Sequence, residues 1–349
     1  MGMDSQKANG RVLLCLTCDV EDSSIESLGL IKETSNKHKA PITWFVEPRL
    51  CREPAALNLL REYGRQGDEV GLHVHWKGSL DVGLRSVSTE QIRTELEEAM
   101  QLLKPYHELV SFRGGGLCQS TPALQTITER GFRFDSSVAS ALDEPEGWHQ
   151  GHDSILPLSA YYPSPRGYDV VSHDGDERLD ILEIPVTRGV PAPILWCNML
   201  EPDITPLTVM KLVFRQYHMR RCFQPLVIMV MILHSWSPER RGTMTRNLDK
   251  FLEYARRHEV DFETVASAGK QWEAIWEHQP GAREAILRQG FSSGLRTLVP
   301  AAFIKLVIFA HNWRQDPRYY PKRILSVCQH GGREGRHEAK HSDEGSGSA

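Results

Sequence analysis

The stretch EVGLHVH, residues 69–75, is a mainly apolar run that carries two histidines, His73 and His75, separated by one residue. A continuous apolar run of this length is typical of a strand buried on both faces, as in parallel sheets. Side chains repeat every second residue along a strand, so both imidazoles are expected on the same face. The pattern therefore places two ring nitrogens close enough to share one ion, although ordinary strand histidines would satisfy it too.

Similar apolar runs recur along the chain, with helical segments between them. The further predicted strands cover residues 11–17, 42–47, 109–114, 132–138, 179–186 and 225–235. Between them, residues 55–64 and 88–105 have helical periodicity, and Ser88 and Gln91 in the second have the spacing of a capping box. Alternating strands and helices predict an α/β domain with a parallel sheet or barrel.

In α/β barrels the chemistry lies at the C-terminal ends of the strands. Polar residues gather where the predicted strands end. Asp19 and Glu21 follow the first strand, His73 and His75 close the third, Arg113 closes the fourth, Asp135 the fifth and His234 the last.

Composition excludes some classes of protein. The chain has 349 residues and a formal net charge of -4, so no overall basic field attracts nucleic acid. The seven scattered cysteines favour a reducing compartment over a disulfide framework. Cys15 and Cys18 would face opposite sides of a strand, which disfavours a metal site formed by this pair. The first apolar run is shorter than the roughly 7–15 residues of a signal core, and we expect a cytoplasmic protein without nucleic-acid partners.

The chain is expected to divide into three parts. The α/β domain should cover residues 8–275, with an irregular excursion at 140–180, and a helical extension should cover 276–330. The polar tail at 331–349 has no large apolar residues and is predicted to be disordered. Within the extension, the apolar run at 298–310 predicts either a buried helix or a helix lying on a membrane surface.

Each polar signal is ambiguous alone, since TCDVED could be a solvated acidic loop and FRGGGLC a glycine-rich turn. Together they point to chemistry. Two histidines and a carboxylate leave open positions on a metal ion, as catalytic sites do. A carboxylate beside the ion can act as general base, and a separate histidine can protonate a leaving amine. The combination predicts metal-assisted hydrolysis.

Six motifs occur in a fixed order between about residue 11 and about residue 275. They are LTCDVED (16–22), APITWFVEP (40–48), GDEVGLHVH (67–75), SFRGGGLC (111–118), GFRFDSSV (131–138) and MILHSWS (231–237). In content and order they resemble the polysaccharide deacetylases, the NodB-homology group of carbohydrate esterases. The resemblance implies a distorted (β/α) barrel with fewer than eight repeats.

The resemblance also implies a role for each polar residue. It makes Asp19 the general base, Glu21 and His73 metal ligands, Arg113 the arginine that holds the base, Asp135 an aspartate that tunes the acid–base pair, and His234 the catalytic acid.

The chain departs from the family pattern at three places. The second metal histidine of the family lies four residues after the first, where this chain has Lys77, so His75 is the substitute. The adjacent Asp-Asp pair is replaced by Asp19-Val20, which leaves Glu21 or Asp22 as the carboxylate ligand. Leu117-Cys118 replaces a Pro-aromatic pair that helps form the oxyanion hole and the sugar contact.

We therefore expect a metal-dependent hydrolase that removes an N-acetyl or similar N-acyl group from an amino sugar or polysaccharide precursor. Mixed nitrogen and oxygen ligands favour zinc, and manganese, iron or cobalt could also occupy such a site. The substrate would be lipid-linked or nucleotide-linked, and residues 298–310 would hold the enzyme at the membrane face. The alternatives are a catalytically silent carbohydrate-binding barrel and a hydrolase of a non-sugar amide or formamide.

Overall fold

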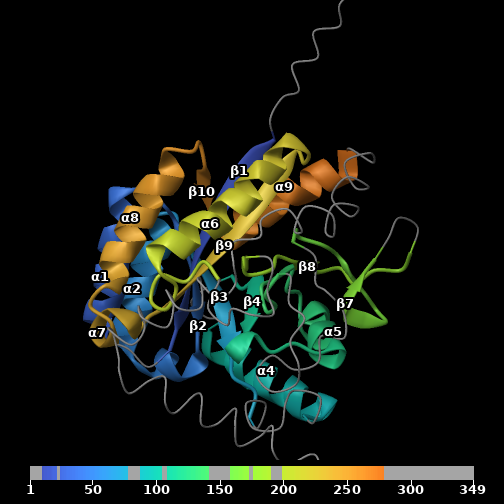
Figure 1. Cartoon of the computed structure of the whole chain (residues 1–349). Coiled ribbons are helices and arrows are strands. Elements are labelled where there is room, and N and C mark those ends of the chain that lie inside the picture. Colours follow the sequence, from blue (N-terminus) through green and yellow to red (C-terminus); the bar gives the residue numbers. More distant parts are fainter. Residues whose placement is uncertain are drawn as a thin grey trace, which may run out of the picture.

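The computed structural model describes residues 10–21, 24–77, 87–103, 108–140, 158–172, 176–189 and 199–278. Its main sheet is parallel throughout (Figure 1). The strands of this sheet are β1 (Arg11–Val20), β2 (Ile42–Val46), β3 (Glu69–Val74), β4 (Ser111–Gly114), β5 (Phe134–Asp135), β8 (Leu182–Glu183), β9 (Leu226–His234) and β10 (Asp261–Glu263). A separate antiparallel pair consists of β6 (Pro163–Ser164) and β7 (Gly167–Val171).

The first strand lies at the centre of the sheet. Strand β9 pairs with it from Arg11 to Asp19, while β10 and β2 share its other edge. The sheet then runs outward through β2, β3, β4, β5 and β8. Beyond β8, the Thr187 N–H donates to the Val230 carbonyl of β9 at 3.0 Å, so the far edge of the sheet returns toward β9. This curled sheet confirms the predicted distorted (β/α) barrel.

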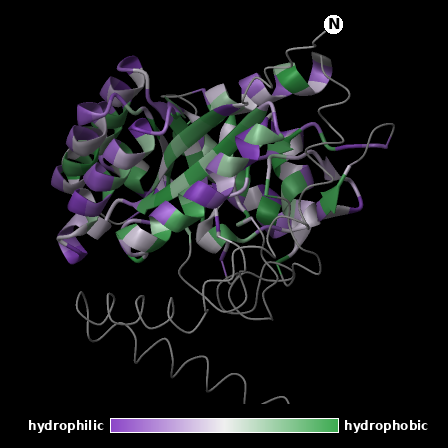
Figure 2. Cartoon of the chain, turned by 45° about the horizontal axis from the view of Figure 1, so that its top comes forward, coloured by the Kyte–Doolittle hydropathy of each residue, from purple (hydrophilic) through white to green (hydrophobic). Residues whose placement is uncertain are grey.

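The central strands are buried along almost their whole length, which explains their continuous apolar sequence. The side chains from Leu13 to Leu16 in β1 and from Met229 to Met231 in β9 are fully buried. Figure 2 shows these apolar strands enclosed by helices whose outer surfaces are polar. Since burying one large aliphatic side chain contributes about 1.5–3 kcal/mol, these two strands form a principal part of the core.

Helices follow most of the strands and cover the outside of the sheet. The α-helices are α1 (Ile25–Lys37), α2 (Pro54–Arg65), α4 (Thr89–Leu103), α5 (Thr121–Glu129), α6 (Leu207–His218), α7 (Ser237–Arg240), α8 (Met244–Arg256) and α9 (Val265–His278). Short 3-10 turns are η1 (Pro48–Arg52), η3 (Gly115–Leu117) and η4 (Met219–Cys222). Ser88 accepts a hydrogen bond from the Gln91 N–H at the start of α4, as their spacing predicts. Helix α1 packs against α8, and α9 packs against β1, β5 and β9.

Several boundaries differ from the sequence prediction. The strands expected at 132–138 and 179–186 shorten to β5 and β8, two residues each, and β6–β7 form a hairpin inside the expected excursion. Residues 279–349 lie outside the described residues, so the predicted extension, the tail and the segment 298–310 do too. Among the described residues, no helix combines the length and apolar character that crossing a bilayer requires.

Candidate metal and acid–base site

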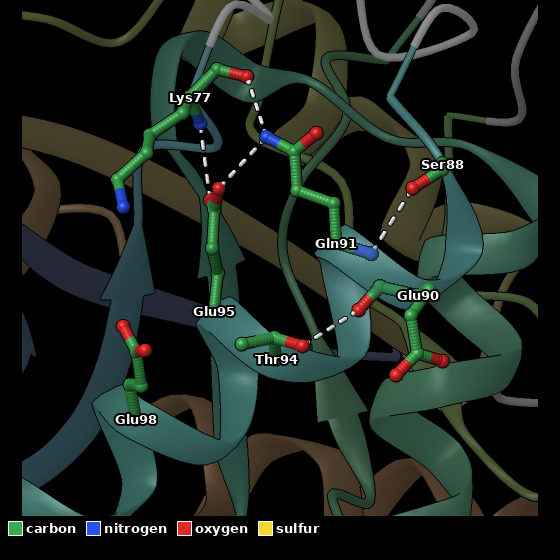
Figure 3. A pocket seen from close by; sticks show the side chains of 7 residues that line it. All are labelled: Lys77, Ser88, Glu90, Gln91, Thr94, Glu95 and Glu98. Carbon is green, nitrogen blue, oxygen red and sulfur yellow. Dashed lines mark hydrogen bonds between the residues drawn. The ribbon is translucent and has the colours of Figure 1, made fainter.

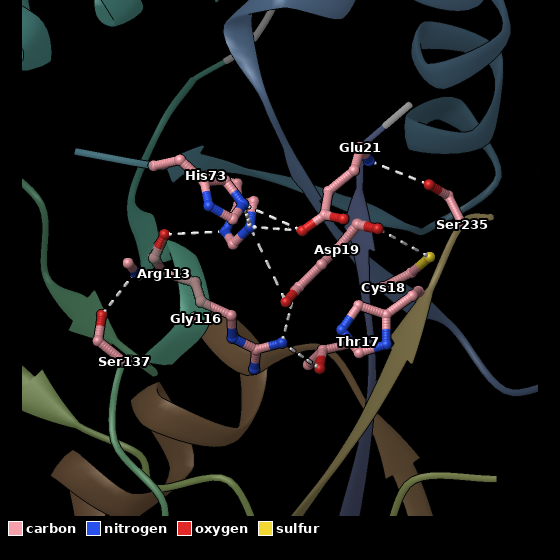
Figure 4. A network of polar contacts seen from close by, with 12 residues as sticks. Thr17, Cys18, Asp19, Glu21, His73, Arg113, Gly116, Ser137 and Ser235 are labelled. Carbon is pink, nitrogen blue, oxygen red and sulfur yellow. Dashed lines mark hydrogen bonds and ion pairs between the residues drawn. The ribbon is translucent and has the colours of Figure 1, made fainter. Parts of the chain in front are cut away.

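Four parallel strands deliver their polar residues to one end of the barrel (Figure 4). In register, His73 of β3 is the partner of Arg113 of β4, and Asp19 of β1 is the partner of His234 of β9. Glu21 directly follows β1, and His75 directly follows β3. The structure thus brings together six of the seven residues that the sequence indicates.

Glu21, His73 and His75 converge on one point. The Glu21 Oε1 atom lies 3.0 Å from His75 Nε2 and 3.5 Å from His73 Nε2, and the two Nε2 atoms are 3.1 Å apart. Ligand atoms that each lie about 2.0–2.1 Å from one ion are roughly 3.0–3.4 Å from one another. The three donor atoms therefore fit a single divalent cation.

The orientations of these ligands are fixed by their other contacts. His73 Nδ1 lies 3.0 Å from the Arg113 carbonyl oxygen, to which it donates, so the lone pair of Nε2 faces Glu21 and His75. The Trp236 indole N–H donates to Glu21 Oε2 at 2.9 Å, which leaves Oε1 directed at the histidines. Glu21 is thus the carboxylate that faces the pair, while Asp22 lies outside the described residues.

The electrostatics of the cluster favour a positive charge at its centre. Burial alone would raise the pKa of Glu21, but hydrogen bonds from His73 and His75 lower it well below the usual range. Burial alone would lower the pKa of His75, yet the Glu21 carboxylate raises it. The negative charge of Glu21 can be balanced in two ways. Either a proton is shared between Glu21 and the histidines, or a divalent cation is bound by all three.

The glycine-rich turn after β4 makes room for His75. A Cβ atom on Gly115 would lie 2.4 Å from Cγ and Nδ1 of the His75 ring, well inside van der Waals contact. The turn continues through Gly116 and Leu117, both with φ in the left-handed region, at 64° and 54°. The triple glycine and the unusual His-x-His spacing are therefore matched to each other.

Asp19 is held by Arg113, as the sequence comparison implies. One nitrogen of Arg113 lies 2.9 Å from Asp19 Oδ1 and 2.7 Å from Thr17 Oγ1, and the rest of the guanidinium donates to Ser136. Both side chains are buried, and the guanidinium lies over the Phe45 ring. The other oxygen, Asp19 Oδ2, is 4.0 Å from His73 Nε2, so it lies beside the cluster of metal-ligating atoms.

His234 lies between two carboxylates that the sequence did not indicate. Its Nδ1 atom is 3.4 Å from Glu201 Oε1 and 3.4 Å from Asp203 Oδ2, and its ring stacks on Trp236. Burial alone would lower the pKa of His234, but the Asp203 and Glu201 carboxylates raise it to about 10. Glu201 and Asp203 lie outside the motifs that the sequence analysis singles out, and their positions in the sequence carry no signal that they approach His234.

Asp135 is the one predicted residue that the structure does not bring to this group. Its register partner is Phe112, so its side chain shares a face with Phe112 and points away from the face that carries Arg113. There it accepts hydrogen bonds from Gln119, at 2.6 Å, and from Ser137, and it is paired in register with Glu183. The carboxylates that face His234 come from elsewhere, and the tuning role implied for Asp135 stays a prediction.

A polar pocket adjoins the turn that follows His75 (Figure 3). The Lys77 N–H donates to Glu95 of α4 at 3.0 Å, and the Gln91 side chain donates to the Lys77 carbonyl at 3.1 Å. Trp76 is buried against Phe112, with ring centroids 6.0 Å apart. These contacts anchor the chain directly after His75 and explain why Lys77, at the family's histidine position, lies in a separate pocket.

Comparison with known proteins gives no match to a family model and no match by sequence to a curated protein. Solved structures do match. A protein assigned as a polysaccharide deacetylase from Mycobacterium smegmatis has a TM-score of 0.53 and 16% identity, covering 77% of this chain and 92% of that one. Another so assigned, from Pseudomonas aeruginosa PAO1, has a TM-score of 0.51 and 13% identity, covering 77% and 93%.

A third solved structure is named for a different activity. The PuuE allantoinase has a TM-score of 0.51 and 12% identity, covering 76% of this chain and 92% of that one. This chain therefore has the fold of the polysaccharide deacetylases, a fold it shares with an allantoinase.

Proposed function

We propose that this protein is a metal-dependent hydrolase that removes an N-acetyl, or similar N-acyl, group from an amino sugar or polysaccharide precursor. The observation that carries the proposal is the convergence of Glu21, His73 and His75 beside Asp19 at the strand ends, with His234 on the adjacent strand β9. The shared fold with polysaccharide deacetylases supports the same conclusion.

Glu21, His73 and His75 would hold the ion. Two imidazole nitrogens and one carboxylate oxygen suit zinc best, while manganese, iron and cobalt accept the same donors. When bound, a divalent ion supplies Lewis acidity toward the amide oxygen and lowers the pKa of water. The remaining steps fall to residues of the chain itself.

Asp19 serves as general base in this proposal. Arg113 occupies its Oδ1 atom at 2.9 Å, so Oδ2, the oxygen nearer His73, is the one that accepts a proton from the attacking water. The attack forms a carbon–oxygen bond at the acyl carbon and gives a tetrahedral intermediate. We assign the N–H groups of the turn at Gly115–Leu117, which lies against His75, to the oxyanion that develops.

His234 completes the reaction as general acid. The two carboxylates at its Nδ1 atom keep the ring as an imidazolium, and Nε2 then donates a proton to the departing nitrogen. The carbon–nitrogen bond breaks, and the products are a free amine on the sugar and a carboxylic acid such as acetate. Proton uptake by Asp19 and release by His234 balance within one turnover.

The substrate proposal extends to carbohydrate precursors that are linked to a nucleotide or to a lipid. It places the protein in the cytoplasm, with the segment 298–310 resting on the membrane face. Full-length protein should then co-sediment with membranes, and the double substitution Leu306→Ser and Phe309→Ser should release it. Equal partition of both proteins into the soluble fraction would remove the membrane contact and leave the hydrolase proposal intact.

Acetate release tests the reaction. Purified protein loaded with Zn²⁺ would be incubated with N-acetylglucosamine oligomers and with nucleotide-linked N-acetyl sugars. Asp19→Asn should abolish release, while Glu129→Gln, at an exposed position at the end of α5, should leave it unchanged. Equal and negligible release by wild type and Asp19→Asn, with metal bound to both, would instead support the silent carbohydrate-binding barrel.

A second candidate, hydrolysis of a non-sugar amide, is favoured by the similar TM-score of the allantoinase. The same constellation of residues would serve it, because the chemistry at the acyl carbon is the same. Measuring formate release from formamides and the ring-opened products of cyclic amides, beside acetate release from N-acetyl sugars, separates the two candidates.

A further inference from the structure

We propose that Glu201 is a positioning residue of this reaction, which forms with Asp203 a two-carboxylate clamp that keeps His234 protonated. The effect of Glu201 on catalysis rests on the proposed function, whereas its effect on the protonation of His234 rests only on the geometry around that ring. The clamp consists of Glu201 Oε1 and Asp203 Oδ2, each 3.4 Å from the same Nδ1 atom.

The local chain brings the two carboxylates to the same ring. The Glu201 carbonyl accepts hydrogen bonds from Ile204 N at 3.3 Å and from Thr205 N at 2.8 Å, which closes a tight turn over residues 201–205. Asp203 is further held by the Ser237 hydroxyl at 2.7 Å, and its carbonyl accepts from Arg241 at 2.9 Å. Since both acids are at most 3% exposed, water does little to screen them from the imidazole.

One carboxylate would be enough to orient the ring, because Nδ1 carries a single proton to donate. Asp203, fixed by Ser237 and Arg241, is suited to that task. A second carboxylate at the same distance adds little directional constraint but adds negative charge in buried surroundings. The specific contribution of Glu201 is therefore to the proton affinity of His234.

The other groups around the ring do not reverse this balance. Asp19 faces it from β1, and Glu21 lies beyond Trp236, whose ring covers one face of the imidazole at 4.9 Å. Arg241 is the cation on the Asp203 side and lowers the pKa of that acid. Among the described residues, the Asp203, Glu201 and Asp19 carboxylates all raise the pKa of His234 against the effect of burial.

The clamp has a consequence for the reaction. With both carboxylates in place, His234 is protonated throughout the neutral range and begins each turnover as an acid. Loss of Glu201 should leave the ring oriented by Asp203 but easier to deprotonate. The alkaline limb of kcat/KM should then move to lower pH, while kcat below that limb should change little.

The test is an NMR titration of the His234 ring in the full-length protein, with the signal assigned by its loss in His234→Gln. Glu201→Gln should lower the titration midpoint by about one pH unit or more, a tenfold or greater loss of proton affinity. Glu201→Asp, which retains the charge, should stay closer to the wild type, and Glu259→Gln, at an exposed position between α8 and β10, should have no effect. Because no substrate is involved, this result is independent of whether the protein hydrolyses an N-acyl group.

Two results would overturn the clamp. One is an unchanged midpoint in folded Glu201→Gln, or an equal fall in Glu201→Asp, which would make the effect one of packing. The other is a second equivalent of Zn²⁺ per chain that Glu201→Gln removes, because Glu201, Asp203 and His234 would then be ligands of a second ion.

Discussion

Asp19 and His234 are register partners on the adjacent parallel strands β1 and β9, so their Cα atoms lie side by side. Partners in a parallel pair point to the same face of the sheet, which sets both side chains toward one region. Their surroundings differ in charge, because Arg113 binds Asp19 while Glu201 and Asp203 flank His234. In the proposed mechanism, this difference in environment is what suits Asp19 to act as the base and His234 to act as the acid.

Removing the cation beside Asp19 should be costly to stability. Arg113→Met leaves a buried carboxylate without its partner, and we expect a loss of about 3–5 kcal/mol in the free energy of unfolding. Urea denaturation followed by circular dichroism measures this. Arg130→Met, which breaks a half-exposed ion pair with Glu97, should cost no more than about 1 kcal/mol. Similar losses of unfolding free energy in the two variants would show that the buried Arg113–Asp19 ion pair stabilises the fold no more than the half-exposed pair does.

Gly115→Ala should weaken metal binding. The added methyl group would meet the His75 ring at 2.4 Å and displace it from Glu21 and His73. We expect the Kd for Zn²⁺, measured by competition with a chelator, to rise by about 10–100-fold. Gly64→Ala in α2 is the matched control, because a methyl group there meets no atom within 4 Å. An unchanged Kd in Gly115→Ala would mean that His75 is not a ligand.

Trp236→Phe should separate two roles of one side chain. The substitution removes the indole N–H that donates to Glu21 Oε2 at 2.9 Å but retains an aromatic ring against His234. Affinity for Zn²⁺ should fall about tenfold, while the His234 titration should stay within a few tenths of a pH unit. Trp272→Phe, which alters a distant stack with Trp276, should change neither. A large shift of the His234 midpoint without loss of metal would contradict this assignment.

The buried pair Asp135 and Glu183 should make stability fall as the pH rises above the pKa values of the unfolded carboxyl groups. Burial raises the pKa of both carboxyls, so the folded state binds protons more tightly than the unfolded state does. Their contribution is therefore greatest below the unfolded pKa values and declines as the pH rises through the folded ones. Glu183→Gln removes one titrating group, and its stability relative to wild type should increase from pH 4 to pH 8, by about 1.4 kcal/mol for each unit of raised pKa.

Urea unfolding at the two pH values measures that increase. The exposed substitution Glu129→Gln should show no such dependence. A difference between Glu183→Gln and wild type that is the same at pH 4 and pH 8 would mean that the pair is not protonated in the folded state.

Much of the fold is predictable because the central strands are buried on both faces. Continuous apolar runs in β1 and β9 reveal them directly, and the helices between strands show a periodic apolar stripe, as Ile92 and Leu96 do in α4. Strand β10 escapes prediction because its three residues are half-buried or exposed and form no apolar run. The hairpin β6–β7 escapes because part of it faces outward, as exposed Val170 shows.

The site is predictable where strand position decides it. Asp19, His73, Arg113 and His234 lie at the same end of parallel strands, so their order in the chain is enough to bring them together. Which face a side chain takes depends on register, and this is why Asp135 cannot be placed from sequence. Glu201 and Asp203 come from an irregular turn more than 30 residues before His234, and only the folded chain reveals the contact.

Metal analysis of the purified full-length protein tests the central claim most directly, since the proposed hydrolysis depends on Glu21, His73 and His75 sharing one ion. After dialysis with Zn²⁺ and removal of excess, mass spectrometry should find one equivalent per chain. His73→Ala and His75→Ala should each lose that ion, and His258→Ala, in the turn after α8, should retain it. Folded wild-type protein without bound metal, or His73→Ala with a full equivalent, would contradict the account.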